Sequence, residues 1–183
     1  FSKIANDGST LPAAAALGTG AGDWACTRDN TTGLLWEVKT ATNTDLRFWL
    51  SLYSWYSTDS ATNAGEPGVT GSFTCMGLPG NLCNTEAFVT AVNAGDGLCG
   101  RTDWRLPTLP EIHTLLHLGV SDPAIDVTYF PNTTSTCYWT ATSDVRADPP
   151  AEAWFQDFSS GVADSYDKAT VTCFVRLVRG GGL

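Results

Sequence analysis

The sequence predicts an α+β fold, in which two short helices in the middle of the chain are bracketed by strands at both ends. The strongest helix signal is Thr108 followed three residues later by Glu111, the spacing of a capping box, with Pro110 in the first turn. Strand-like runs lie before residue 40 and after residue 136. Because 183 residues suit one domain and no linker interrupts them, we expect residues 1–183 to fold as a single domain.

The N-terminal part contains two expected strands and two expected loops. Residues 1–5 form a short strand candidate, and residues 33–39 alternate enough to form a strand after a turn. Residues 12–22 are rich in Gly and Ala, which favours a surface loop. Residues 47–56 are aromatic-rich and fit either a strand or a helix. Residues 57–82 are dominated by Gly, Ser, Thr, Asn and Pro, so we expect a long loop of the kind that is functional or covalently pinned.

Two amphipathic helices are expected in the middle of the chain, followed by three strands. The first helix spans residues 84–94 and the second spans residues 109–118. Their apolar faces carry Phe88, Val89 and Val92 on the first helix and Ile112, Leu115 and Leu116 on the second. The strand candidates that follow are residues 137–142, 153–158 and 172–179, separated by polar segments. We expect a mostly antiparallel sheet.

Composition and charge exclude several classes of partner. The formal net charge is -9 and only 16% of residues are charged, while Thr, Ser, Asn and Gly are abundant. Phosphate backbones and anionic membrane surfaces require a basic patch, so we expect neither nucleic-acid binding nor attachment to such a surface. No apolar run approaches the roughly 18 residues that span a bilayer, so we expect no membrane insertion. This composition is typical of a secreted or surface protein.

The six cysteines indicate disulfide bonds, because their number is even and the C-x-x-C spacing of zinc ribbons and thioredoxin-like sites does not occur. They are Cys26, Cys75, Cys83, Cys99, Cys137 and Cys173. In one set of pairs, Cys75 joins Cys83 across a Gly/Pro-rich loop and two strand-like runs are linked through Cys137 and Cys173. That set leaves Cys26 with Cys99. The main rival set joins Cys26 to Cys75 and Cys83 to Cys99, and reduced core thiols are a third interpretation.

Several short motifs run in order along nearly the whole chain. They are Trp24-x-Cys26-x-x-Asp29, Thr32-Gly33-Leu34-x-Trp36-Glu37, Asp103-Trp104-Arg105-Leu106-Pro107-Thr108, Ile125-Asp126-x-x-Tyr129-Phe130-Pro131, Tyr138-Trp139, Ala153-Trp154 and Val175-Arg176-Leu177-Val178-Arg179-Gly180. Together they resemble the family of the C-terminal domain of Legionella collagen-like protein. The resemblance implies a C-type lectin-like fold, which is shared with variable ligand-binding proteins of diversity-generating retroelements and with formylglycine-generating enzymes.

The same resemblance implies a recognition module outside the cytoplasm, at a cell surface or after secretion or periplasmic export. We expect a non-catalytic adhesion or ligand-binding role toward a glycan or a protein, and one form of it is a sequence-variable display protein of a diversity-generating retroelement. The named family member binds glycosaminoglycans, but a chain with net charge -9 lacks the cationic surface that a sulfated polymer needs. A trimerisation head on a fibrous stalk is the structural alternative, and the oligomeric state is not predicted.

If that fold holds, the polar connections between the late strands should contact the ligand, because the scaffold fixes the backbone there while side chains can vary. Tyr supplies an apolar face with a hydroxyl, and Arg supplies a planar fork of donors. The expected ligand-binding residues are Asp144, Arg146, Gln156, Asp157, Tyr166 and Lys168. The tryptophans outside the motifs, Trp49 and Trp55, include a candidate exposed platform, although the core is favoured for both.

Metal and cofactor sites have weak support in the sequence. His113 and His117 have i, i+4 spacing, but Thr114 stands where a metalloprotease has Glu and no third His exists, so no zinc site is predicted. The late acidic residues, whose oxygens suit Ca²⁺, are Asp144, Asp148, Glu152, Asp157, Asp164 and Asp167. The sugar-binding triplet of Ca²⁺-dependent lectins is missing, and a solvated acidic face is the simpler interpretation. We therefore predict no cofactor, with Ca²⁺ as the alternative.

No catalytic constellation stands out, so we predict that the chain is not an enzyme. A Ser-His-Asp arrangement, a phosphate loop and a dinucleotide fingerprint are all missing from the sequence. Glu37 and Asp103 resemble the carboxylate pair of a glycosidase. The simpler interpretation is that they form ion pairs with buried Arg105 or Arg176, because buried charges must be paired. An oxidase of the formylglycine-generating type is the remaining alternative, and it would need a free reactive thiol.

Overall fold

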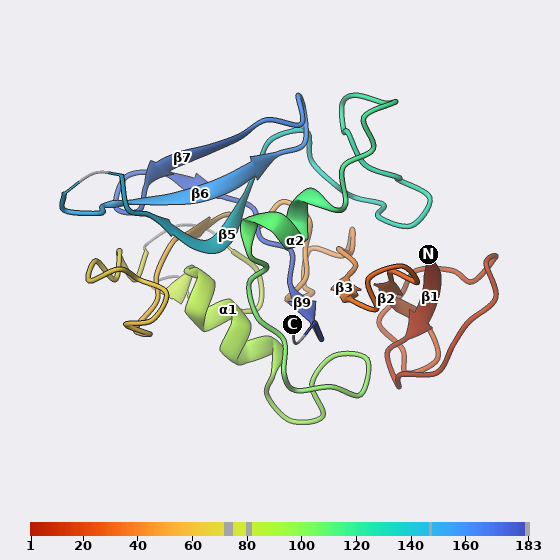
Figure 1. Ribbon diagram of the computed structural model, residues 1–183. Coiled ribbons are helices and arrows are strands. Elements are labelled where there is room, and N and C mark those ends of the chain that lie inside the picture. Colours follow the sequence, from red (N-terminus) through yellow and green to blue (C-terminus); the bar gives the residue numbers. More distant parts are fainter. Residues whose placement is uncertain (72–74, 80–81, 147, 182–183) are drawn as a thin grey trace.

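Strands from both ends of the chain pair in one antiparallel sheet (Figure 1). The computed structural model describes residues 1–71, 75–79, 82–146 and 148–181. The strand order in this sheet is β1 (Ser2–Ala5), β2 (Trp24–Arg28), β3 (Leu35–Glu37) and β9 (Val178–Arg179). Trp36 of β3 lies opposite Val178 of β9, and both side chains are fully buried. The C-terminal strand therefore completes a sheet that the N-terminal strand begins.

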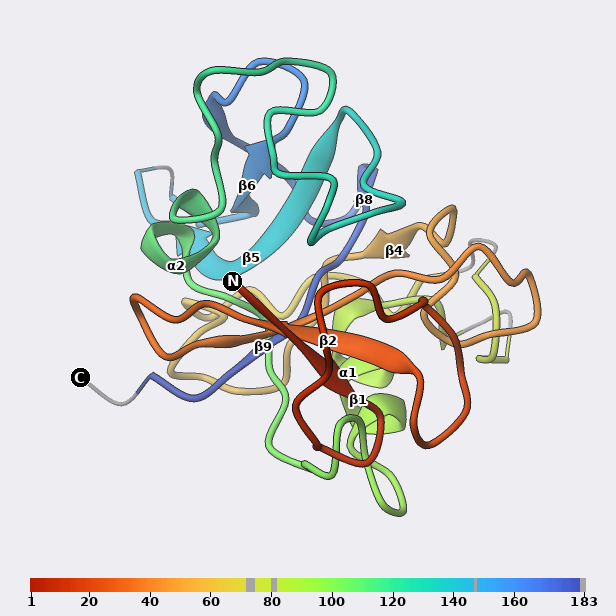
Figure 2. The same cartoon turned by 90° about the vertical axis from the view of Figure 1, so that its right-hand side faces the viewer.

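A second antiparallel sheet consists of β5 (Cys137–Asp144), β6 (Glu152–Asp157) and β7 (Ala163–Asp167). A separate antiparallel pair joins β4 (Tyr53–Ser54) to β8 (Thr172–Cys173). Figures 1 and 2 show the β5–β6–β7 sheet on one side of the molecule and β1 and β2 on the other. The fold is α+β, as predicted. No helix among the described residues is long and apolar enough to cross a membrane.

Both predicted helices are present, and side-chain caps define their starts. In α1 (Thr85–Val92), the Asn84 side chain accepts a hydrogen bond from the backbone N of Ala87. In α2 (Leu109–His113), the predicted capping box between Thr108 and Glu111 is formed in both directions.

The second helix is shorter than the predicted span of residues 109–118. After the C-cap at Thr114, the backbone N of His117 donates to the carbonyl of Ala124 instead of continuing the helix. Leu115 is buried in a turn beyond the helix end. The apolar pattern in the sequence therefore continues past the last helical residue, which is why the predicted span was too long.

The strand predictions were partly wrong. β2 and β7 were not predicted, and residues 47–56 contribute only the two-residue strand β4. The predicted strand at residues 172–179 is divided into β8 and β9, which belong to different sheets. Residues 174–177 between them are buried. The run was apolar because this segment crosses the core from one sheet to another.

Tryptophans form much of the core, and several of their indole N–H groups donate to backbone carbonyls. Trp55 is fully buried and donates to Thr140 O at 2.9 Å, so it is a core residue, whereas Trp49 is partly exposed.

The structure corrects the expected partners of Glu37 and Asp103. The carboxylate of Glu37 lies 2.7 Å from Lys39 Nζ, while Asp103 pairs with Arg179. Burial lowers the pKa of Lys39 to about 8, against the opposing attraction of Glu37.

All six cysteines are paired, and the favoured set is confirmed. Cys26 joins β2 to Cys99 in the segment after α1. Cys75 and Cys83 close a short loop before α1. Cys137 of β5 is bonded to Cys173 of β8, which ties the three-stranded sheet to the small β4–β8 pair. The rival pairing and the reduced state are both excluded.

Candidate functional site

Asp144 and Arg146, two of the predicted ligand-binding residues, lie together where β5 ends. The Arg146 side chain donates to both carboxylate oxygens of Asp144, from Nε at 2.8 and 2.9 Å and from Nη2 at 2.5 Å. The backbone N of Arg146 also donates to Asp144 at 3.0 Å. The Asp144 side chain is almost fully buried, whereas 63% of the Arg146 side chain is exposed. A buried carboxylate therefore anchors an exposed guanidinium.

Trp154 of β6 provides a surface beneath that guanidinium. The Arg146 Cζ atom lies 4.5 Å from the centroid of the partly exposed indole, which is cation–π geometry. Ser165, opposite Trp154 on β7, accepts from Arg146 Nη2 at 3.3 Å and donates to Glu152 at 2.5 Å. We call this group the Arg146 platform. Its members are Asp144, Arg146, Glu152, Trp154 and Ser165.

The ion pair also shifts the titration of its members. Hydrogen bonds from Arg146 hold the pKa of Asp144 well below its usual value, although burial of the carboxylate acts in the opposite direction. Hydrogen bonding to Asp144 raises the pKa of the Arg146 guanidinium. Asp144 therefore stays ionised, and Arg146 stays held, under moderately acidic conditions.

Two other predicted residues lie elsewhere on the three-stranded sheet. Asp157 accepts from the backbone N and the hydroxyl of Ser159, so its carboxylate stabilises the turn between β6 and β7. Burial acts to raise the pKa of Asp157, but these hydrogen bonds outweigh it and lower the pKa. Tyr166 is 41% exposed and stacks on Phe155 with ring centroids 4.1 Å apart. Because neighbours on a strand alternate, Tyr166 lies on the sheet face opposite Ser165 and the platform.

The structure corrects the expected positions of Gln156 and Lys168, which are buried instead of exposed. The amide of Gln156 donates to the carbonyls of Asp157 and Val162, both at 3.1 Å. Lys168 Nζ donates to three backbone carbonyls at distances of 2.9 to 3.1 Å, and it lies 4.4 Å from the centroid of Trp55. These carbonyls belong to Asn63, Glu66 and Pro150. Neither side chain has polar groups left to offer a ligand at the surface.

Sequence reasoning missed Trp154, Glu152 and Ser165 as platform members. Trp154 belongs to the Ala153-Trp154 motif, and only the tryptophans outside the motifs were considered as exposed platforms; Ser165 lies in a strand that was not predicted. No group of three or more His, Cys, Asp or Glu side chains that could hold a metal ion occurs among the described residues. Nδ1 of the exposed His113 lies 3.1 Å from Gln156 Oε1, which gives this histidine a protein partner.

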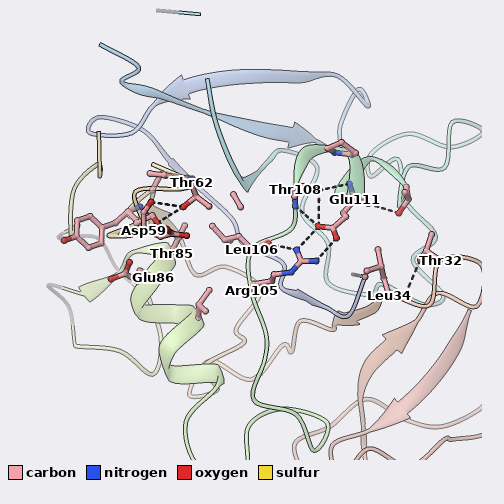
Figure 3. A pocket seen from close by; sticks show the side chains of 18 residues that line it. Thr32, Leu34, Asp59, Thr62, Thr85, Glu86, Arg105, Leu106, Thr108 and Glu111 are labelled. Carbon is pink, nitrogen blue, oxygen red and sulfur yellow. Dashed lines mark hydrogen bonds and ion pairs between the residues drawn. The ribbon is translucent and has the colours of Figure 1, made fainter. Parts of the chain in front are cut away.

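A large open groove lies between α1 and α2, with a volume of about 1120 Å³ (Figure 3). Figure 3 shows Asp59, Thr85 and Glu86 at one end, Leu106 in the middle and the Arg105–Glu111 pair toward the other end. The complete lining is Thr32, Leu34, Trp55, Tyr56, Ser57, Asp59, Thr62, Thr85, Glu86, Val89, Arg105, Leu106, Thr108, Pro110, Glu111, Thr114, Ala141 and Gly181. The only sequence signal for it was the length of the polar segment 57–82, which supplies part of one wall.

Hydrogen bonds hold that wall against the start of α1. The hydroxyl of Thr85 accepts from Tyr56 N at 2.9 Å and donates to Tyr56 O at 2.7 Å. Glu86 Oε2 accepts from the backbone N and the hydroxyl of Thr58, at 2.6 and 2.8 Å. These bonds fix the segment that carries Tyr56 and Thr58 against the first residues of α1.

The opposite end of the groove is built around Arg105. Its two terminal nitrogens donate to Glu111 at 2.6 and 2.7 Å, and they also reach the carbonyls of Leu106 and Gly180. Hydrogen bonding to Glu111 raises the pKa of Arg105. Burial acts to raise the pKa of Glu111, but its bonds to Arg105 and Thr108 outweigh that effect and lower it. This pair joins the capping box of α2 to the C-terminal segment.

Comparison with known proteins assigns the chain to a family. A family model described as the Lcl C-terminal domain matches residues 25–179. The chain belongs to the Lcl C-terminal domain family. The match confirms the resemblance seen in the motifs, and it covers every residue of the Arg146 platform and all of the groove lining except Gly181. No curated protein and no solved structure matches the chain.

Proposed function

We propose that this Lcl C-terminal domain is a non-catalytic, extracellular ligand-binding module with a C-type lectin-like fold. In this proposal the Arg146 platform recognises a glycan or a protein at a surface. The observation that carries it is the exposed guanidinium of Arg146, fixed by a buried carboxylate over the partly exposed ring of Trp154. A sequence-variable display protein of a diversity-generating retroelement is one form that such a module takes.

The platform offers the chemistry that recognition surfaces use. Arg146 employs Nε and Nη2 within the protein, and Nη1 makes no hydrogen bond to any described residue. Its N–H groups suit carboxylates and sugar hydroxyls, while the adjacent indole suits the apolar face of a sugar ring or a peptide side chain. Because Asp144 restrains the guanidinium before binding, less conformational entropy is lost when a ligand arrives.

Two further observations support the non-catalytic and extracellular parts of the proposal. Disulfide pairing of all six cysteines speaks against an oxidase of the formylglycine-generating type, which requires a free reactive thiol. Three disulfides also suit an oxidising compartment outside the cytoplasm, and the family is named for the C-terminal domain of a collagen-like protein.

The proposal is tested by probing glycan and protein arrays with the purified chain. For a ligand found there, Arg146→Ala should weaken binding about tenfold, because it removes the exposed fork of donors. Arg101→Ala is the matched control, since it removes the same charge from another exposed position. Arg101→Ala should melt close to the wild-type temperature, whereas Arg146→Ala should stay folded but melt at a lower temperature, because the buried Asp144 carboxylate loses its partner. Binding is therefore compared well below both melting temperatures. Equal affinities of the wild type and Arg146→Ala would exclude the platform, and light scattering that finds a stable trimer would favour the structural-head alternative.

A further inference from the structure

The groove between α1 and α2 provides a second interaction surface, distinct from the Arg146 platform. We propose that it binds an extended peptide segment of a protein partner, one that carries a Lys or Arg side chain next to apolar residues. The cationic side chain would lie between Asp59 and Glu86, and the apolar residues would lie along Leu106 toward α2 (Figure 3).

The size of the groove favours a peptide over a small molecule. Its volume of about 1120 Å³ exceeds the range of about 300–1,000 Å³ that is usual for small-molecule pockets. Its lining also includes the apolar side chains of Leu34, Val89, Leu106, Pro110 and Ala141. A glycan would leave much of this surface unmatched, whereas apolar side chains of a peptide would cover it.

The charge of the groove favours a cation. Its charged lining residues are Asp59, Glu86, Glu111 and Arg105, which sum to a formal charge of -2 from three acids and one base. The charge of the base is already paired, because both terminal nitrogens of Arg105 donate to Glu111 and to backbone carbonyls. An anionic ligand would therefore have to compete with Glu111 for Arg105, the one cation among the lining residues.

The two remaining acids have capacity for a cationic partner. Neither Asp59 nor Glu86 forms an ion pair within the described part of the chain. Glu86 receives both of its hydrogen bonds on Oε2, and Asp59 receives one on Oδ1 from Ala61 N. The other oxygen of each carboxylate makes no hydrogen bond to a described residue, so both can accept from an ammonium or guanidinium group.

The groove is also held in shape before any partner arrives. Thr85 and Glu86 fix the loop that carries Asp59, and the Arg105–Glu111 pair fixes the start of α2. A fixed groove lowers the entropic cost of binding a flexible peptide. The observations therefore converge on one occupant, an apolar peptide with a single basic side chain.

A random heptapeptide library displayed on phage provides the probe, selected against the whole chain. Enriched peptides should combine Lys or Arg with neighbouring apolar residues. For a synthetic copy of such a peptide, the double variant Asp59→Asn with Glu86→Gln should bind about five- to thirtyfold more weakly, because two exposed charge pairs are lost. The amide oxygens still accept the bonds from Ala61 and Thr58, so the groove should keep its shape. Raising the salt concentration should weaken wild-type binding in the same direction.

Two control variants test whether the loss of peptide affinity in the double variant comes from the groove. Asp96→Asn removes one negative charge from an exposed residue outside the groove lining, and it should leave peptide affinity unchanged. Arg146→Ala should also leave it unchanged, which separates this inference from the function proposed for the platform. The inference is overturned if selection yields no peptides or peptides without a basic residue. It is equally overturned if the double variant binds as tightly as the wild type, or if Arg146→Ala abolishes binding.

Discussion

Asp144 shows how one buried carboxylate prepares an exposed residue for binding. Its pKa lies well below that of an unfolded aspartate, because Arg146 donates to both of its oxygens. A lowered pKa in the folded state means that the group stabilises the fold above its unfolded pKa of about 4, and that this contribution is lost as the pH falls below that value. The ion pair therefore links the stability of the sheet to the orientation of the platform.

We predict that Asp144→Asn reduces the acid sensitivity of the fold. Wild-type unfolding free energy should fall as the pH is lowered from 5 to about 2, and the variant should lose less over the same interval. Other carboxylates with a lowered pKa, including Asp103 and Glu111, also make the unfolding free energy fall at low pH. Part of the pH dependence should therefore remain in both proteins. Urea unfolding at a series of pH values measures the difference, with Asp96→Asn as the control. Identical slopes for wild type and variant would contradict this interpretation of the pair.

At this residue scale, sequence reasoning could not tell which side chains would contact one another. Asp144 and Arg146 were each expected to contact a ligand, and the structure places them in one ion pair with each other. Lys168 follows a polar stretch and was expected to be exposed, but it donates to carbonyls from two distant loops and is buried. Nothing local to Lys168 encodes those carbonyls, which lie 18 or more residues away along the chain.

The same contrast between local and distant signals holds for whole elements. The start of α2 was predicted because Thr108 and Glu111 encode it within four residues. Its end was not predicted, because the backbone N of His117 bonds to Ala124, whose position depends on the returning chain. β7 was missed because its sequence, Ala-Asp-Ser-Tyr-Asp, has little strand propensity, and its pairing with β6 places it in the sheet.

The disulfides that connect the elements should differ in how much each one contributes to the unfolding free energy. In the loop-entropy model, Cys26–Cys99 with a separation of 73 stabilises by about 4 kcal/mol and Cys75–Cys83 with a separation of 8 by about 2.5 kcal/mol. We therefore predict that the double variant Cys26→Ala, Cys99→Ala loses ~1–2 kcal/mol more unfolding free energy than Cys75→Ala, Cys83→Ala. Denaturant unfolding of both purified variants measures this difference. A larger loss for the short loop would show that native-state packing, and not chain entropy, dominates.

For the whole molecule, the decisive feature is the return of the C-terminal segment into the first sheet. Val178 is paired with Trp36 on β3, and its backbone N and O both bond to Arg105 at 3.0 Å. Arg105 in turn holds Glu111 at the start of α2. One buried residue near the C-terminus thus connects the N-terminal sheet, the segment between the helices and one end of the groove. This connectivity is the reason that a single domain spanning residues 1–183 stays our prediction.

A chain that ends at Leu177 tests this connectivity. We predict that it loses at least about 3 kcal/mol of unfolding free energy, because it gives up the burial of Val178 and several backbone hydrogen bonds that include both bonds to Arg105. The matched control is Arg179→Ala, which removes only the exposed pair with Asp103 and should cost about 1 kcal/mol or less. Thermal unfolding followed by tryptophan fluorescence and near-ultraviolet circular dichroism should show one shared transition for the full chain. Two separate transitions, or a truncated chain as stable as the control, would mean that the sheet with β1 and the rest of the molecule fold independently.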